Sequence, residues 1–146
     1  MPAKTIRRLS KAPLIAIIDD DEAVREALSD LLLVLDLSCR TFDRAEAFMA
    51  EYTPGSFDCL ITDVSMPGWS GLDLLQHLRS IGSSMPVIII TADPNPTTRS
   101  RAMRGGAYAY LTKPVSSDAL FRHLQSALRH VGSSADGDGQ GKPSDG

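Results

Sequence analysis

Residues 57–68 read FDCLITDVSMPG, an apolar run that ends in one carboxylate and a Pro-Gly pair. An apolar run bounded by turn residues is typical of a buried parallel strand. The Pro67-Gly68 pair predicts that this strand stops just past Asp63. Open α/β sheets carry their reactive groups at the carboxyl ends of the strands. We therefore interpret Asp63 as a reactive group, and specifically as a phosphoryl acceptor.

Short apolar runs and segments of helical spacing alternate on both sides of this strand. Further strands are predicted at residues 14–18, 37–42, 86–91 and 107–111. Apolar residues at helical spacing predict helices that begin near Glu22, Asp43, Ser70, Thr97 and Ser117, the last one ending near His130. The second of these helices has a capping-box pattern, Asp43 followed by Glu46. Such alternation predicts a parallel sheet with helices on both faces.

Length and composition favour one globular domain. The 146 residues are 42% hydrophobic, enough for a single core. We expect a flexible basic arm at 1–12, a folded domain at 13–131 and a disordered tail rich in Gly, Ser and Asp at 132–146. The net charge of −3 argues against nucleic-acid binding by the whole surface. No apolar run could span a bilayer, so we expect a cytoplasmic protein whose two cysteines are reduced.

Polar side chains end four of the predicted strands. In chain order they are Asp19 with Asp20, then Asp63, Thr91 and Lys113. Right-handed crossovers place all these strand ends on one edge of the sheet. Three clustered carboxylates repel one another, and their hard oxygen ligands suit Mg²⁺. Asp63 would be ionised and could attack phosphorus, with the three phosphoryl oxygens assigned to Mg²⁺, Lys113 and the Thr91 hydroxyl.

These residues give the chain a resemblance to a known family. The matching motifs are Asp19-Asp20, Asp63 with Met66-Pro67-Gly68, Thr91-Ala92 and Lys113-Pro114, in that order and at strand ends. Together they resemble the receiver domain of two-component response regulators over residues 13–131. The runs IDDDEAVR and MPGWSGLDLL are most similar to receivers of the FixJ type. The resemblance implies a flavodoxin-like (CheY-like) doubly wound sheet of five parallel strands in the order 2-1-3-4-5, with five helices.

The resemblance also implies residue roles and partners. Asp63 would accept a phosphoryl group from a phosphohistidine on a histidine kinase or histidine phosphotransfer protein. Asp19, Asp20, Asp63 and the backbone carbonyl of Ser65 would hold Mg²⁺, and Lys113, before a cis bond to Pro114, would pair with the phosphate. Thr91 and Tyr110 would switch the surface built by the fourth helix, fifth strand and fifth helix. That surface would engage a downstream protein or a second copy.

Several alternatives stay open at this point. A phosphatase of the haloacid dehalogenase type would need a second Asp where Ser65 stands, so we expect no enzyme beyond slow self-catalysed phosphorylation and dephosphorylation. A flavodoxin-like cofactor binder would need a phosphate loop where three aspartates stand. A receiver could also work by docking without phosphorylation. Finally, the chain is interpreted as a stand-alone receiver, and the alternative is a fragment of a FixJ-type DNA-binding transcription factor.

Overall fold

A parallel sheet runs through the middle of residues 13–137, the part of the chain that the computed structural model describes. Its strands are β1 (Leu14–Ile18), β2 (Ser38–Phe42), β3 (Cys59–Asp63), β4 (Val87–Thr91) and β5 (Ala109–Thr112). The five strands are ordered β2-β1-β3-β4-β5, and every neighbouring pair is parallel. The predicted fold and strand order are confirmed. The expected basic arm at 1–12 lies outside the described residues.

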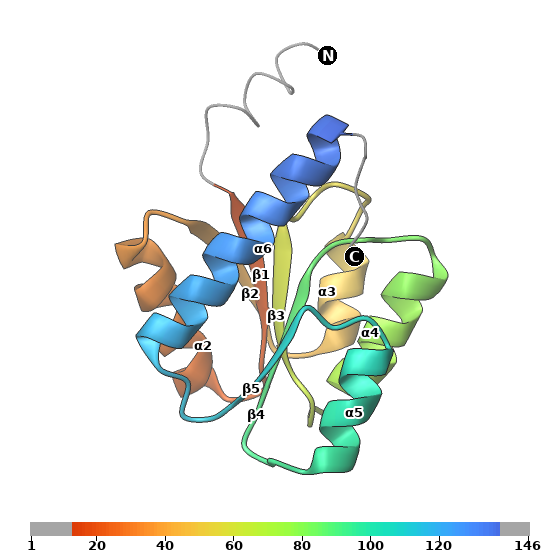
Figure 1. The fold of residues 1–146 in the computed structure, drawn as a ribbon. Coiled ribbons are helices and arrows are strands. Elements are labelled where there is room, and N and C mark those ends of the chain that lie inside the picture. Colours follow the sequence, from red (N-terminus) through yellow and green to blue (C-terminus); the bar gives the residue numbers. More distant parts are fainter. Residues whose placement is uncertain (1–12, 138–146) are drawn as a thin grey trace.

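Helices cover both faces of the sheet (Figure 1). They are α2 (Glu22–Val34), α3 (Ala45–Glu51), α4 (Gly71–Ser80), α5 (Pro96–Arg104) and α6 (Ser117–Gly137). The apolar faces of α2 and α6 pack on one side of the sheet, and those of α3, α4 and α5 pack on the other. Within residues 13–137, no helix has the length and apolar character needed to cross a membrane.

The central strand, β3, is buried along its whole length. Successive side chains of a strand point to opposite faces. Leu60 accordingly packs with the core on the α3, α4 and α5 side, while Cys59 and Ile61 pack against α2 and α6. Thr62 points away from Asp63, and its hydroxyl donates to the backbone carbonyl of Asp63 over 3.0 Å. Of the two polar side chains at the end of β3, only that of Asp63 therefore lies on the face of the sheet covered by α2 and α6.

The helix starts follow local capping chemistry with one exception. Asp21 caps α2 by accepting from the Ala23 N–H, and Ser70 with Asp73 forms a complete capping box at α4. The capping box expected from Asp43 and Glu46 is wrong, because α3 begins one residue later and has no side-chain cap. Glu46, the acid of the expected capping box, binds a distant residue instead: its carboxylate accepts from the Trp69 N–H over 3.2 Å.

The last helix extends further than the sequence pattern indicated. It continues to Gly137 instead of ending near His130, so part of the segment expected to be disordered has a helical backbone. Gly132 does not stop it, because a glycine lowers helix propensity by about 1 kcal/mol but keeps the backbone hydrogen bonds. Residues 138–146 of the expected tail lie outside the described residues.

The two cysteines are expected to differ sharply in reactivity. Both are free thiols, Cys39 partly exposed on β2 and Cys59 buried on β3. Burial raises the pKa of the Cys59 thiol to about 12, so almost none of it is the reactive thiolate at neutral pH. We expect iodoacetamide to modify Cys39 alone in the native protein and both residues in denaturant, as measured by peptide mass mapping. Equal native labelling of the two would contradict the burial of β3.

Candidate functional site

The carboxyl ends of β1, β3 and β5 bring one lysine between two carboxylates. The Lys113 ammonium donates to Asp19 Oδ2 over 2.8 Å and to Asp63 Oδ2 over 3.1 Å. Asp19 and Asp63 are buried, and Lys113 keeps 21% of its side chain exposed. Residues separated by 50 and 94 positions therefore meet because the parallel strands of the sheet all end at the same edge.

Asp20 completes an acidic cluster at the same edge. One carboxylate oxygen from each of Asp19, Asp20 and Asp63 lies within 4.8 Å of the other two. Asp20 is exposed, whereas its two neighbours are buried, so the cluster opens to solvent on the Asp20 side. Carboxylate oxygens in this arrangement are the ligands that a hard divalent cation prefers. The donor set thus fits Mg²⁺, with Asp20 at the entrance.

The charges of this cluster are not balanced by the lysine. Three carboxylates around one ammonium leave two negative charges in excess. Burial raises the pKa of the Asp63 carboxyl, Lys113 opposes that rise without cancelling it, and Asp19 adds to it. Burial alone would lower the pKa of Lys113, but the hydrogen bonds that its ammonium donates to Asp19 and Asp63, and the charges of these two carboxylates, outweigh burial and raise that pKa. A cation at Asp20 would relieve this excess.

Thr91 and Tyr110 lie on the neighbouring strands, β4 and β5. The Thr91 hydroxyl is buried and accepts from the Asp93 N–H over 3.1 Å. The Tyr110 ring is also buried, and its hydroxyl donates to the backbone carbonyl of Asp93 over 3.3 Å. The Arg99 guanidinium lies 5.6 Å from the centre of that ring. The two predicted switch residues therefore share one loop residue, Asp93, although the switch itself stays a prediction.

The structure also describes the surroundings of Ser65 and the peptide bond after Lys113. The Ser65 N–H donates to Asp63 Oδ1 over 3.4 Å, so the loop after β3 folds back on the acceptor side chain. The Lys113-Pro114 bond is cis, as the resemblance implied. The ligand role of the Ser65 carbonyl stays a prediction.

The sequence analysis did not identify two residues that help to position the site. Arg25, on α2, donates from Nη1 to the backbone carbonyl of Asp19 over 2.7 Å and ties the helix to the strand end. Gly71 donates to the Val64 carbonyl over 2.9 Å, and a Cβ added there would lie 2.2 Å from the carbonyl oxygen of Asp63. A glycine one residue after a helix cap was the available signal for such a close approach.

Comparison with known proteins places this site in a family. A model of the response regulator receiver domain matches residues 15–125. The chain is 36% identical over 130 residues to the response regulator protein TodT of Pseudomonas putida, covering 88% of this chain and 57% of that protein. It is 36% identical over 117 residues to the transcriptional regulatory protein FixJ of Bradyrhizobium diazoefficiens, covering 80% and 57%.

A solved structure agrees with these relatives. The response regulator StyR superimposes with a TM-score of 0.79 at 34% sequence identity, covering 85% of this chain and 63% of that one. The chain thus spans 57% of the length of the curated relatives named above. The family match covers every strand residue except Leu14 and all of the polar residues at the sheet edge. The chain therefore belongs to the family of response regulator receiver domains of two-component systems.

Proposed function

We propose that this receiver is a phosphoacceptor switch whose acceptor is Asp63. The observation that carries the proposal is the Lys113 ammonium held between Asp19 and Asp63 at 2.8 and 3.1 Å, beside a third carboxylate. The phosphoryl donor is a phosphohistidine on a histidine kinase or histidine phosphotransfer protein. An Asp63 carboxylate oxygen forms the new bond to phosphorus as the bond from phosphorus to the histidine nitrogen breaks. The product is an acyl phosphate, and the donor histidine recovers its nitrogen lone pair.

The chain's own residues supply position and charge for this transfer. Lys113 holds the Asp63 carboxylate in place and offers a positive charge to the incoming phosphoryl oxygens. The buried Thr91 hydroxyl offers a hydrogen-bond donor from the next strand. Asp19, Asp20, Asp63 and the Ser65 carbonyl would hold Mg²⁺, which supplies electrostatic neutralisation when bound. No second carboxylic acid stands two residues after Asp63, which supports an acceptor with slow self-catalysed turnover instead of a phosphatase.

The output would pass through the surface made by α5, β5 and α6. Thr91 and Tyr110 both bond to Asp93, in the loop before α5, so a new bond between Thr91 and a phosphoryl oxygen competes with that arrangement. The surface would then engage a downstream protein or a second copy of the chain. We propose a stand-alone receiver of the cytoplasm, and the alternative is the receiver portion of a FixJ-type DNA-binding transcription factor. The mass of the endogenous protein on an immunoblot separates these two arrangements.

Intact mass measured after incubation with acetyl phosphate tests the phosphoacceptor chemistry. We expect one phosphoryl adduct per chain in the presence of Mg²⁺ and almost none when the metal is chelated with EDTA, because the acidic cluster repels an anionic donor. The adduct should disappear in hydroxylamine, which cleaves acyl phosphates. The absence of an adduct under every condition would contradict the proposal and favour a receiver that works by docking alone.

A further inference from the structure

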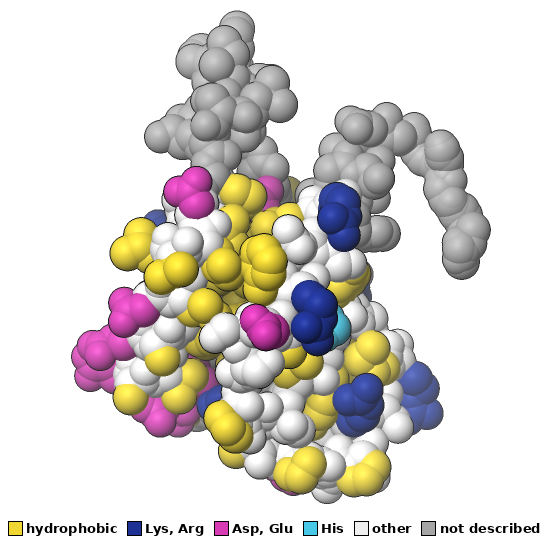
Figure 2. All heavy atoms as spheres, turned by 60° about the vertical axis from the view of Figure 1, so that its left-hand side comes forward, with side chains coloured by type: hydrophobic (Ala, Val, Ile, Leu, Met, Phe, Trp, Pro, Cys, Tyr) yellow, Lys and Arg dark blue, Asp and Glu magenta, His cyan; other side chains and the backbone are white. Residues whose placement is uncertain are grey.

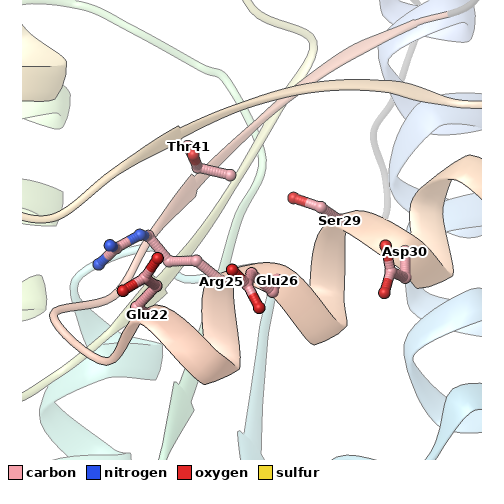
Figure 3. Close-up of a pocket in the computed structure, with 6 residues that line it drawn as sticks. All are labelled: Glu22, Arg25, Glu26, Ser29, Asp30 and Thr41. Atoms are coloured by element: carbon pink, nitrogen blue, oxygen red, sulfur yellow. The ribbon is translucent and has the colours of Figure 1, made fainter.

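An acidic hollow lies between α2 and the edge strand β2. It has a volume of about 360 Å³ and is lined by side chains that Figure 3 labels: Glu22, Arg25, Glu26, Ser29, Asp30 and Thr41. The three acids come from successive turns of α2 and are exposed. Arg25 lies among them, but its guanidinium donates to the backbone carbonyl of Asp19 at the strand end. The hollow therefore has a negative charge that this arginine only partly offsets.

A basic groove lies on the opposite side of the sheet, between α4 and α5. It has a volume of about 370 Å³, its apolar floor is formed by Leu72 and Leu75, and three arginines border it: Arg79, Arg101 and Arg104. Arg79 is fixed in place, because it donates to the carbonyls of Ser83 and Gly106 over 3.0 and 2.9 Å. Arg101 and Arg104 are exposed in the last turn of α5.

The charges of both surfaces are unpaired within residues 13–137. No ion pair involves Arg79, Arg101 or Arg104 in this part of the chain. Among the same residues, no ion pair involves the acids Glu22, Glu26 or Asp30 either. On the one face of the molecule that Figure 2 draws, acidic and basic side chains gather in different places, the acids mostly toward the left edge. A chain with a net charge of −3 thus keeps a local basic surface and a separate acidic one.

We propose that the acidic hollow of one chain binds the arginine-bordered groove of a second copy. The two surfaces lie on opposite sides of one sheet, so a chain cannot join its own surfaces. Contact of this kind is head-to-tail. Each copy that binds leaves one unoccupied hollow or groove, to which a further copy can bind. Exposed apolar side chains adjoin the charges on both sides. Leu33 continues the acidic side of α2 and is 74% exposed, and Met103 lies between the two α5 arginines and is 42% exposed.

The energetics predict weak, salt-sensitive association. An exposed ion pair contributes about 0–1 kcal/mol, so the contact needs several pairs together with its apolar rim. Screening shortens the reach of such pairs from about 20 Å at low salt to a few ångströms near 1 M. We expect sedimentation to show an average mass that rises with protein concentration at low salt and returns to that of the monomer at high salt. Association that persists unchanged at high salt would overturn the proposal.

Neutralising variants of the two surfaces test the geometry. Arg101→Gln with Arg104→Gln removes the basic surface, and Glu26→Gln with Asp30→Asn removes the acidic one. Each double variant alone should associate about tenfold more weakly than the wild type. Arg44→Gln removes an exposed charge at the start of α3, outside both surfaces and outside the surface made by α5, β5 and α6. It is the control and should associate like the wild type.

Mixing the two double variants gives the sharpest result. Each retains the surface that the other has lost, so we expect a one-to-one complex that does not grow further. A mixture that stays monomeric, or one that forms large assemblies, would overturn head-to-tail binding. Circular dichroism confirms that each variant is folded, which is expected because all four positions are exposed. Asp63→Asn should associate like the wild type, so failure of this inference is separable from failure of the phosphoacceptor proposal.

Discussion

Replacing Asp63 by Asn is expected to abolish the phosphoryl adduct while leaving the fold intact. Asn has nearly the same shape, and its amide oxygen can still accept from Lys113, which now contacts Asp63 over 3.1 Å. Its neutral amide is a poor nucleophile toward phosphorus, so acetyl phosphate and Mg²⁺ should give no adduct. The measurement is intact mass, with circular dichroism spectra and the thermal midpoint recorded on the same samples.

Two matched substitutions make this result specific. Asp118→Asn removes an exposed carboxylate from the first turn of α6 that is not a member of the acidic cluster, and this variant should be phosphorylated like the wild type. Asp20→Asn keeps the acceptor but removes the exposed member of the acidic cluster, so its adduct should form slowly and depend less on Mg²⁺. An adduct retained in Asp63→Asn would show that another residue is the acceptor. Loss of the adduct in Asp118→Asn would point to a general defect.

Gly71→Ala is expected to cause the largest loss of stability of any single methyl addition near the site. The added Cβ would lie 2.2 Å from the backbone oxygen of Asp63 and 3.1 Å from its carbonyl carbon. Backbone atoms cannot turn aside as a side chain can, so either α4 or the end of β3 must shift. Overpacking of a tight site costs about 1–3 kcal/mol, and we expect the upper end of that range in the free energy of unfolding measured with urea.

Gly55→Ala separates this steric effect from the loss of a glycine as such. Gly55 has a φ of +81°, and nothing lies within 4 Å of its added Cβ. Its substitution should therefore cost only the strain of a left-handed backbone, about 1 kcal/mol. Gly71→Ala should in addition slow phosphorylation, because the clash acts on the residue that carries the acceptor. A Gly71→Ala protein as stable and as readily phosphorylated as the wild type would contradict the close approach of α4 to β3.

The sequence alone was enough to predict the parallel sheet and most of the polar residues that meet at the carboxyl ends of its strands. The strands are short apolar runs with polar ends, and parallel pairing gathers those ends on one edge whatever the details of the helices. Asp63 and Lys113 could therefore be placed together although 50 residues separate them. The cap of α2 at Asp21 and the capping box at Ser70 were also predictable, because both act within a few residues of chain.

Features that depend on distant neighbours were not predictable. Glu46 fits a local capping box, but in the folded chain it accepts from Trp69, which lies 23 residues away. In the sequence, nothing distinguishes Arg25 from other polar residues of a helix. Its bond to the Asp19 carbonyl is apparent only in the folded structure. The end of α6 was placed too early because residues 132–146 have no large apolar side chain to bury and were expected to be disordered, whereas the helix continues to Gly137. The basic groove exists only because α4 and α5 are adjacent in space.

The position of Asp63 on β3 determines which parts of the site can move. β3 is hydrogen-bonded on both sides, to β1 and to β4, and all five of its residues are buried. Such a strand opens only in global unfolding, so its amide protons should exchange with solvent among the slowest in the domain. The acceptor is accordingly anchored at the end of a strand that is buried and paired on both sides. A phosphoryl donor must be brought to a fixed carboxylate, and any conformational response falls to the loops after β3 and β4, where local opening requires far less free energy.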